Sequence, residues 1–386
     1  MEISRRAAAR FSAAMHKPRR LISRFRLRIW ELEGEERETG LPLRVLYAGR
    51  RRGRAYFSKT AFASAPKATE RGTAWLPAAL RSSAREAPRC PLAVLETPRF
   101  FFRIYPRSDG YFVPSWVGLK LDISEARRRI KNHSGVKSDL RKARKAGFVP
   151  EITTDPALFD LFYHRMYVPY IRRSHGEAAA FSGDAWLKKH ASRGELLLVK
   201  RSGEYVAGVF RLFRGSQAGA VLIGIRDGDP GILKAGVTSL MFADCVSHIG
   251  RRGYRRMRLG NSRSFIRDGS LQFKRKWGGF VFSATKNGLW IRIRDDTPGG
   301  RAFLTNNPFI ARERGRMVRV SFLDNPVVWD RARLAALEKR LRIGGAPDLR
   351  LVLLDGSPGE IEPPELPGRK ITVEMVRPLG RSPGRR

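Results

Sequence analysis

The chain of 386 residues carries 76 Lys and Arg against 36 Asp and Glu, a formal charge of +40 at pH 7, while 42% of its residues are hydrophobic. Its two cysteines exclude a disulfide framework, and the absence of any run of about 18 apolar residues excludes a predicted membrane-spanning helix. The charge predicts an anionic partner such as nucleic acid, a phosphorylated cofactor or an anionic membrane face, unless it is simply solvated surface charge. We expect a cytoplasmic protein, with peripheral contact at the inner face of the membrane left open.

The first 91 residues form a basic region that we expect to be partly disordered. Residues 1–30 are rich in Arg and lack the continuous apolar core of a secretory signal. Residues 43–47 and 54–58 flank a stretch of Gly and Arg as the two strands of a hairpin would. Residues 64–91 are rich in Ala, Pro, Ser and Arg, which predicts a linker.

Residues 92–150 are expected to form an N-terminal α/β half with basic helices. Residues 92–96 and 99–105 are predicted strands, and residues 122–125 have the spacing of a capping box that begins a helix. Between residues 127 and 145, nine residues are Lys or Arg and only one is acidic. Such a helix face is either solvated or binds an anion.

Residues 151–297 are expected to form the main domain. After residue 195, three apolar stretches separated by Gly-containing turns predict an antiparallel meander. Apolar residues at helical spacing predict a helix after Gly236. A charged strand then runs from Tyr254 into the turn Gly260-Asn261-Ser262, followed by a basic and aromatic run and two further strands. The remainder, residues 298–386, is a C-terminal extension whose tail from about residue 363 we expect to be weakly ordered.

Two stretches resemble the FemAB-like branch of the GNAT superfamily of acyltransferases. Residues 140–148, LRKARKAGF, resemble a helix of that branch written LRKAxxxGF. Residues 253–260, GYRRMRLG, and residues 273–278, FKRKWG, repeat two further runs of the branch in the same order. The resemblance covers roughly Pro114 to Arg294. It implies an α/β fold with a GNAT-type mixed, largely antiparallel sheet flanked by helices, and a second, smaller GNAT-like half before it.

The resemblance also implies an N-acyltransferase that passes an acyl group, from acyl-CoA as donor substrate, to an amine of a sugar, peptide or cell-envelope precursor. In the superfamily the donor pyrophosphate rests on backbone N–H groups at a helix N-terminus. The corresponding cofactor-binding residues here are Lys234, Ala235, Gly236 and Val237, although this stretch departs from the usual loop sequence of the superfamily. Two alternatives stay open: a transferase that uses aminoacyl-tRNA, and a catalytically silent scaffold that binds nucleic acid or another polyanion.

Candidate site residues follow from the same resemblance. The catalytic candidates are His175 and Glu177, in a loop that contributes to the acceptor site in relatives, and Asn261 at the end of the charged strand. The substrate-binding candidates are Ser262, Arg263, Lys274, Lys276 and Trp277, because cations beside a flat ring suit phosphate or a stacked base. The alternatives are that Asn261 and Ser262 only form the turn and that Trp277 belongs to the core. His, Cys, Asp and Glu show no metal-ligand spacing, so we expect no metal.

Overall fold

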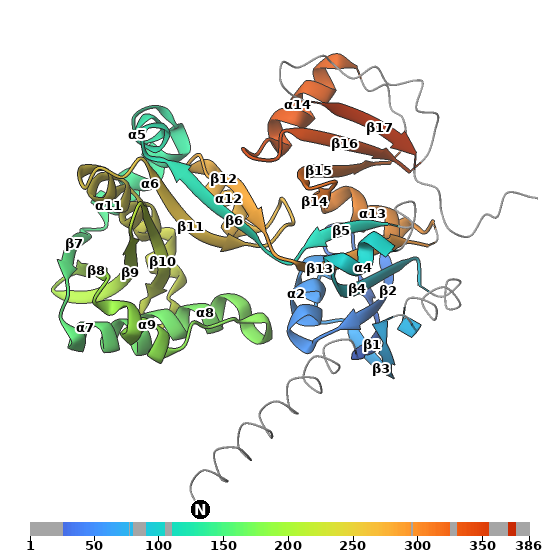
Figure 1. Ribbon diagram of the computed structural model, residues 1–386, viewed down its shortest axis with the longest axis horizontal. Coiled ribbons are helices and arrows are strands. Elements are labelled where there is room, and N and C mark those ends of the chain that lie inside the picture. Colours follow the sequence, from blue (N-terminus) through green and yellow to red (C-terminus); the bar gives the residue numbers. More distant parts are fainter. Residues whose placement is uncertain are drawn as a thin grey trace, which may run out of the picture. The chain divides into compact units, whose positions relative to one another are not determined.

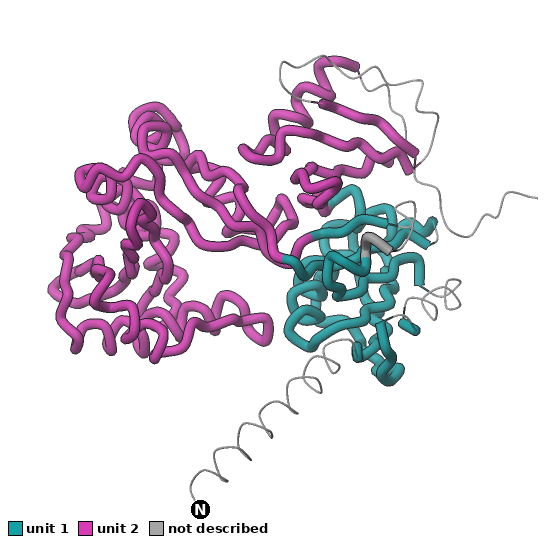
Figure 2. Tube along the Cα trace, viewed as in Figure 1, with its two compact units in different colours: residues 1–113, 286–306, 376–386 teal, residues 114–285, 307–375 magenta. Residues whose placement is uncertain are grey.

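The structure, a computed structural model, describes residues 26–76, 78–79, 90–104, 110–294, 296–324, 330–354 and 370–375. Expectations for residues 1–25 and for most of the tail after residue 363 lie outside these ranges. The chain divides into two units, one of residues 1–113, 286–306 and 376–386, the other of residues 114–285 and 307–375 (Figure 2). The predicted boundaries at residues 91, 150 and 297 do not coincide with this division, because the chain returns to the first unit after residue 285.

The first unit is built on a six-stranded mixed sheet with the strand order β3-β1-β2-β4-β13-β5. The strands are β1 (Arg26–Glu35), β2 (Pro42–Gly49), β3 (Lys67–Trp75), β4 (Leu92–Pro98), β5 (Tyr111–Pro114) and β13 (Asn287–Ile293). The helices are α2 (Arg51–Ala61), α4 (Arg99–Ile104) and α13 (Pro298–Asn306) (Figure 1). β2 and β4 pair in parallel, whereas β1 pairs with β2 and β3 antiparallel. A separate α/β unit therefore precedes the main sheet, and it begins at β1, within the region that was expected to be partly disordered.

Several elements of this unit differ from the predictions. Residues 54–58 belong to α2 and not to a strand, because Phe57 and Ala61 lie one helical turn apart and are both buried. Residues 99–104 form helix α4 in place of the predicted strand. Part of the predicted linker is β3, whose residues are almost all exposed. An exposed edge strand carries no apolar alternation, so its sequence offers no strand signal.

The second unit is built on a seven-stranded sheet with the strand order β12-β6-β11-β10-β9-β8-β7. The strands are β6 (Val117–Asp122), β7 (Val149–Thr153), β8 (Gly194–Arg201), β9 (Glu204–Arg214), β10 (Gln217–Ile225), β11 (Arg256–Ser262) and β12 (Phe280–Ala284). β8, β9 and β10 form the predicted antiparallel meander, and β10 pairs with β11 in parallel. The predicted fold class, a mixed and largely antiparallel sheet flanked by helices, is confirmed.

Helices cover this sheet on both faces (Figure 1). One set is α5 (Ile123–Asn132), α6 (Ser134–Lys145), α11 (Val237–Arg251) and α12 (Gly269–Lys276), which share a core with β6 and β11. The other set is α7 (Pro156–Leu161), the π-helix η2 (Phe162–Tyr167), α8 (Val168–His175) and α9 (Asp184–Ala191). The short connections are η3 (Gly176–Ala178), η4 (Arg226–Gly228) and α10 (Pro230–Lys234). α5 begins where predicted, since the Asp122 side chain accepts a hydrogen bond from the Ser124 backbone N–H.

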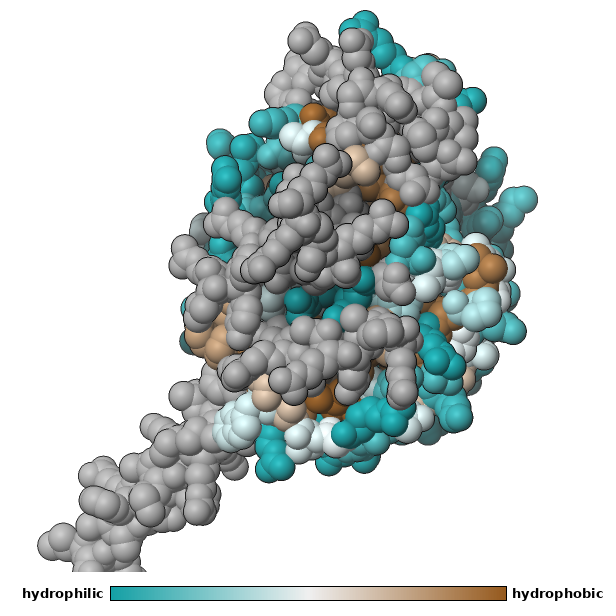
Figure 3. Space-filling view, turned by 90° about the vertical axis from the view of Figure 1, so that its right-hand side faces the viewer, coloured by the Kyte–Doolittle hydropathy of each residue, from teal (hydrophilic) through white to brown (hydrophobic). Residues whose placement is uncertain are grey.

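A third sheet completes the second unit, with the strand order β14-β15-β16-β17. Its elements are β14 (Phe309–Glu313), β15 (Arg316–Leu323), helix α14 (Arg331–Leu341), β16 (Asp348–Leu353) and β17 (Ile371–Met375). β17 lies within the predicted weakly ordered tail, yet it pairs in parallel with β16. On the described part of one face, hydrophilic residues surround small apolar patches (Figure 3). Among the described residues no helix is both long enough and apolar enough to cross a membrane.

Candidate acyl-transfer site

β10 and β11 are neighbours that separate along most of their length. Their parallel pairing is confined to Ala218–Gly219 with Met257–Arg258. β10 continues along β9 with a bulge directly after Ala220. Extending the short register places Asn261 opposite Leu222, in the part where the two strands do not pair. Backbone N–H and C=O groups on this side of β10 are therefore free to bind a ligand.

Lys274 lies on α12 at the end of β11. Its Nζ donates a hydrogen bond to the Asn261 carbonyl oxygen at 2.7 Å, and the residue is only 7% exposed. Burial lowers the pKa of the Lys274 ammonium to about 8, and the charge of Asp268 acts in the opposite direction. Lys274 is therefore mostly protonated at pH 7, and it loses its proton far more readily than a surface lysine.

Asp268 is the N-cap residue of α12. Its Oδ1 accepts a hydrogen bond from the Leu271 backbone N–H at 3.1 Å. Burial raises the pKa of Asp268, while that hydrogen bond and the charges of Lys274, Arg263 and His175 oppose the rise. Lys274, Arg263 and His175 were predicted site residues, and all three lie near the carboxyl group of Asp268, which was not predicted. Its signal in the sequence is the helix start Asp268-Gly269-Ser270, which is typical of an N-cap and carries no mark of function.

The turn after β11 has both structural and exposed groups. Asn261 is exposed and pairs with Gly118 of β6 on one side. Ser262 is buried, and its hydroxyl lies 3.1 Å from the Ser270 hydroxyl, so it holds β11 to α12. The Arg263 guanidinium lies 3.9 Å from the centre of the Trp116 ring. Asn261 and Arg263 are consequently the residues of this turn that a substrate can reach.

His175 and Glu177 occupy the end of α8 and the turn η3, and both are exposed. His175 lies close enough to Asp268 to affect the pKa of its carboxyl group. No ion pair links Glu177 to any other residue in the described ranges. The structure brings His175, but not Glu177, toward the remaining site residues.

Lys276 and Trp277 pack away from the end of β11. The Lys276 ammonium forms an ion pair with Asp139 of α6. Trp277 is fully buried, with its ring 5.8 Å from that of Phe242 and 6.4 Å from that of Phe273. Both side chains therefore join α12 to α6 and α11. The prediction that they bind substrate is not supported, and the alternative that Trp277 belongs to the core is correct.

The N-terminus of α11, where the pyrophosphate was predicted to bind, is occupied by residues of α6. Gly236 has φ 89°, and a Cβ there would lie 2.5 Å from the Asp139 carbonyl oxygen. The Asp139 carboxylate accepts a hydrogen bond from the Ser239 hydroxyl at 2.8 Å, at the first turn of α11. Burial raises the pKa of Asp139, but hydrogen bonds from Lys276 and Ser239 outweigh it, so the pKa is lowered and the group is an anion at neutral pH. Ala235 is half-buried and Val237 buried, and only Lys234 is exposed.

A pyrophosphate at this helix terminus would meet the backbone of α6 and a carboxylate. These residues therefore do not fit the pyrophosphate of coenzyme A, although a free helix N-terminus would attract it.

Asp160, His164 and Asp184 present ligand atoms within 4.8 Å of one another, a grouping that the sequence did not reveal. The Lys188 ammonium lies 3.1 Å from Asp160 and 2.9 Å from Asp184. Since one ammonium already forms ion pairs with both carboxylates, and exposed acidic groups are common without a metal, the group does not by itself constitute a metal centre.

The splayed strands, the bulge on one of them and the helix that follows define a GNAT-type acyltransferase domain. Residues 130–275 match the family model described as acetyltransferase (GNAT) domain. The predicted resemblance to the GNAT superfamily is thereby confirmed for this stretch, and the chain carries a GNAT acyltransferase domain there.

Several solved structures are similar to this chain at low sequence identity. One is the C-terminal domain of a protein described as a lysylphosphatidylglycerol synthetase from Agrobacterium fabrum, with 11% identity over 71% of this chain and 83% of that chain and a TM-score of 0.35. FemX has 12% identity over 66% of this chain and 82% of that chain, with a TM-score of 0.36. A GCN5-related N-acetyltransferase from Sphaerobacter thermophilus has 14% identity over 69% and 77%, with a TM-score of 0.30. No curated protein matches the sequence.

Proposed function

We propose that the protein transfers an aminoacyl group from an ester on RNA to an amine, at the end of β11. The observation that carries the proposal is the buried, protonated Lys274, which is bonded to Asn261 in the part of β11 that does not pair with β10. A cation held in a site of low dielectric stabilises a developing oxyanion far more than the same cation does in water. The acceptor remains the one predicted from the sequence, an amine on a sugar, peptide or cell-envelope precursor.

The reaction assigns a role to each group at the site. The acceptor nitrogen attacks the ester carbonyl carbon, the C–N bond forms, and the carbonyl electron pair moves to oxygen. Lys274 has three N–H donors, one of which bonds to Asn261, and a second donates to this oxyanion. A backbone N–H of β10 near the bulge after Ala220 is the other group that donates a hydrogen bond to the oxyanion. When the intermediate collapses, the C–O bond breaks and the leaving ribose oxygen takes the proton that the nitrogen loses. His175 is the group that transfers this proton from the nitrogen to the oxygen.

The choice of an RNA ester over acyl-CoA rests first on the closed terminus of α11. It also rests on charge: seven cations of α5 and α6 are exposed and form no ion pair with a described residue, namely Arg127, Lys131, Lys137, Arg141, Lys142, Arg144 and Lys145. The two acids of these helices already bind other cations, since Glu125 pairs with Arg128 and Arg129, and Asp139 with Lys276.

Spacing on the second helix fits a phosphate backbone. Lys137, Arg141 and Lys145 recur every fourth residue, about 6 Å apart along the axis of α6. The exposed large apolar side chains of the described residues lie elsewhere, so α5 and α6 offer no apolar wedge for a lipid surface. A polyanion such as tRNA therefore suits this face better than a membrane does.

The test is transfer of a labelled amino acid from mixed aminoacyl-tRNA to a panel of amino-sugar and peptide acceptors, with acetyl-CoA as a parallel donor. We expect turnover from aminoacyl-tRNA, reduced by about 100-fold or more in Lys274→Met, retained in part in Lys274→Arg, and unchanged in Lys339→Met, an exposed control on α14. Turnover from acetyl-CoA alone would refute the RNA donor. Binding of random RNA without any transfer would favour the silent scaffold.

A further inference from the structure

β12 is the terminal strand of the seven-stranded sheet, and one of its edges is only partly used. β6 pairs with it along one side, from Phe280 to Ala284. On the other side, the Val281 backbone N–H donates to the Gly344 carbonyl oxygen at 2.8 Å. No described strand pairs with this side of β12. An unpaired strand edge is a row of donors and acceptors that another extended chain can satisfy.

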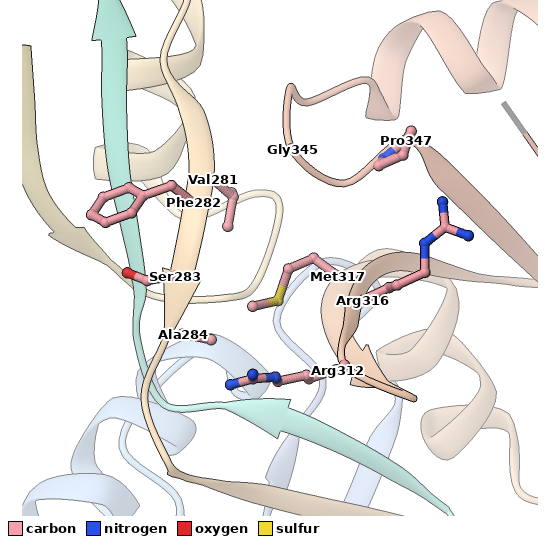
Figure 4. A pocket seen from close by; sticks show the side chains of 10 residues that line it. Val281, Phe282, Ser283, Ala284, Arg312, Arg316, Met317, Gly345 and Pro347 are labelled. Carbon is pink, nitrogen blue, oxygen red and sulfur yellow. The ribbon is translucent and has the colours of Figure 1, made fainter. Parts of the chain in front are cut away.

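A cavity of about 500 Å³ lies along this edge, between β12, the β14–β15 hairpin and the loop before β16. Figure 4 shows the Arg312 guanidinium extending toward Ala284 and the Met317 thioether pointing toward β12. The loop closes one end, because Gly345 lies so near β12 that a Cβ there would overlap the Val281 carbonyl oxygen. The volume suits a short peptide or a ligand of similar size, and it is too small for a folded partner.

The cavity contains a cation without an anion. The Nε atom of Arg312 is buried and has no hydrogen-bond partner, and no described acid forms an ion pair with its guanidinium. Two acids on the neighbouring strands bind other arginines: Glu313 lies 2.5 Å from Arg350, and Asp348 lies 3.3 Å from Arg316. Burying a guanidinium N–H without an acceptor is unfavourable, so Arg312 offers a donor and a positive charge that an anionic ligand can satisfy.

Among the described residues that line the cavity, no aromatic ring is free to stack a nucleobase. The Phe282 ring points away from Arg312 in Figure 4, and it already has the Lys120 ammonium at 4.9 Å and the Arg258 guanidinium at 5.1 Å. The walls near Arg312 are instead Ala284 and Met317. A strand edge, small apolar walls and one fork-shaped cation are the elements that recognise an extended peptide with a carboxylate.

We propose that this cavity binds a short extended peptide, which adds a strand to the free edge of β12 and places a carboxylate on Arg312. The site lies apart from Lys274, and the proposal does not depend on the acyl-transfer reaction. The carboxylate comes from either the C-terminus or an acidic side chain of the peptide, and the two sources are separable by experiment.

The test uses the full chain and three fluorescein-labelled tetrapeptides measured by fluorescence anisotropy. Val-Thr-Val-Gln with a free C-terminus carries only a terminal carboxylate, Val-Thr-Val-Glu amide carries only a side-chain carboxylate, and Val-Thr-Val-Gln amide carries neither. We expect at least one carboxylate peptide to bind about tenfold or more tightly than the neutral one, and Arg312→Met to abolish this difference. Lys339→Met, which removes one exposed charge from α14, should leave it intact.

Hydrogen exchange gives a second measure that needs no variant. The carboxylate peptide should slow exchange of β12 amides between Phe282 and Ala284, while the neutral peptide should not. Equal affinity of all three peptides, equal loss of binding in Arg312→Met and Lys339→Met, or an unchanged exchange pattern would each overturn the proposal.

Discussion

Replacing Lys274 with Met should make the protein more stable and less active at neutral pH. The pKa of Lys274 is lowered from 10.5 to about 8, because the ammonium is buried. A difference of about 2.5 pH units corresponds to about 3 kcal/mol of folding free energy. Loss of the hydrogen bond to Asn261 offsets about 1 kcal/mol of this, so Lys274→Met should gain about 2 kcal/mol.

The sign of the effect sets the pH range of the test. Below pH 8 Lys274 is charged in both the folded and the unfolded chain, and the folded state bears the full penalty of burying the charge. As the pH rises from about 8 to 10.5, the unfolded chain keeps the proton that the folded chain loses, so the wild type becomes more stable. The advantage of Lys274→Met should therefore be largest near pH 7 and nearly vanish by pH 10.5.

Urea unfolding of both proteins from pH 7 to 10.5 measures this difference directly, and groups that do not interact with Lys274 cancel in the comparison. Activity should change in the opposite direction, with kcat lower by about 100-fold to 1,000-fold, as for loss of one oxyanion donor. The ratio of wild-type kcat to that of Lys274→Arg should fall as pH passes 8, because only the lysine loses its charge. A destabilised Lys274→Met at pH 7, or a ratio that does not change with pH, would refute the assignment of Lys274 as a buried cation.

Three further outcomes are expected. Gly236→Ala should lower the free energy of unfolding by about 1–3 kcal/mol, because Gly236 has a positive φ and lies against the Asp139 carbonyl oxygen. Thermal denaturation measures this change, and an unchanged melting temperature would contradict the contact. Lys142→Glu should weaken tRNA binding and reduce its salt dependence by about one ion, as measured by filter binding. Lys276→Glu should chiefly destabilise the fold, as measured by denaturation, because it breaks the ion pair with Asp139. Equal effects of the two variants in both assays would contradict this distinction. The Cys245 thiol is fully buried with its pKa raised to about 12, so a thiol reagent should modify it only on unfolding, and rapid labelling of the native chain would contradict that burial.

Local sequence alone determined much of the second unit. The meander of β8 to β10, the start of α5 at Asp122 and the helix after Gly236 were all predicted, because apolar periodicity and capping residues act over a few positions. The resemblance to the GNAT superfamily followed from short sequence runs that occur in the same order as in that family. The same local signals failed in the first unit, where α2 depends on the burial of Phe57 and where β3 is an exposed edge strand.

The tertiary structure decided which of the candidate residues meet. Lys274, Lys276 and Trp277 are near neighbours in one basic and aromatic run, yet one turn of helix sends Lys274 to β11, Lys276 to α6 and Trp277 into the core. Asp268 becomes important because folding buries it near Lys274, Arg263 and His175, and no local pattern records that burial. The closure of the α11 terminus by Asp139, about a hundred residues away in the chain, is likewise a long-range contact. Local sequence therefore determined most elements of the second unit, whereas long-range packing determined α2 and β3 of the first unit and the burial and access of the groups at the site.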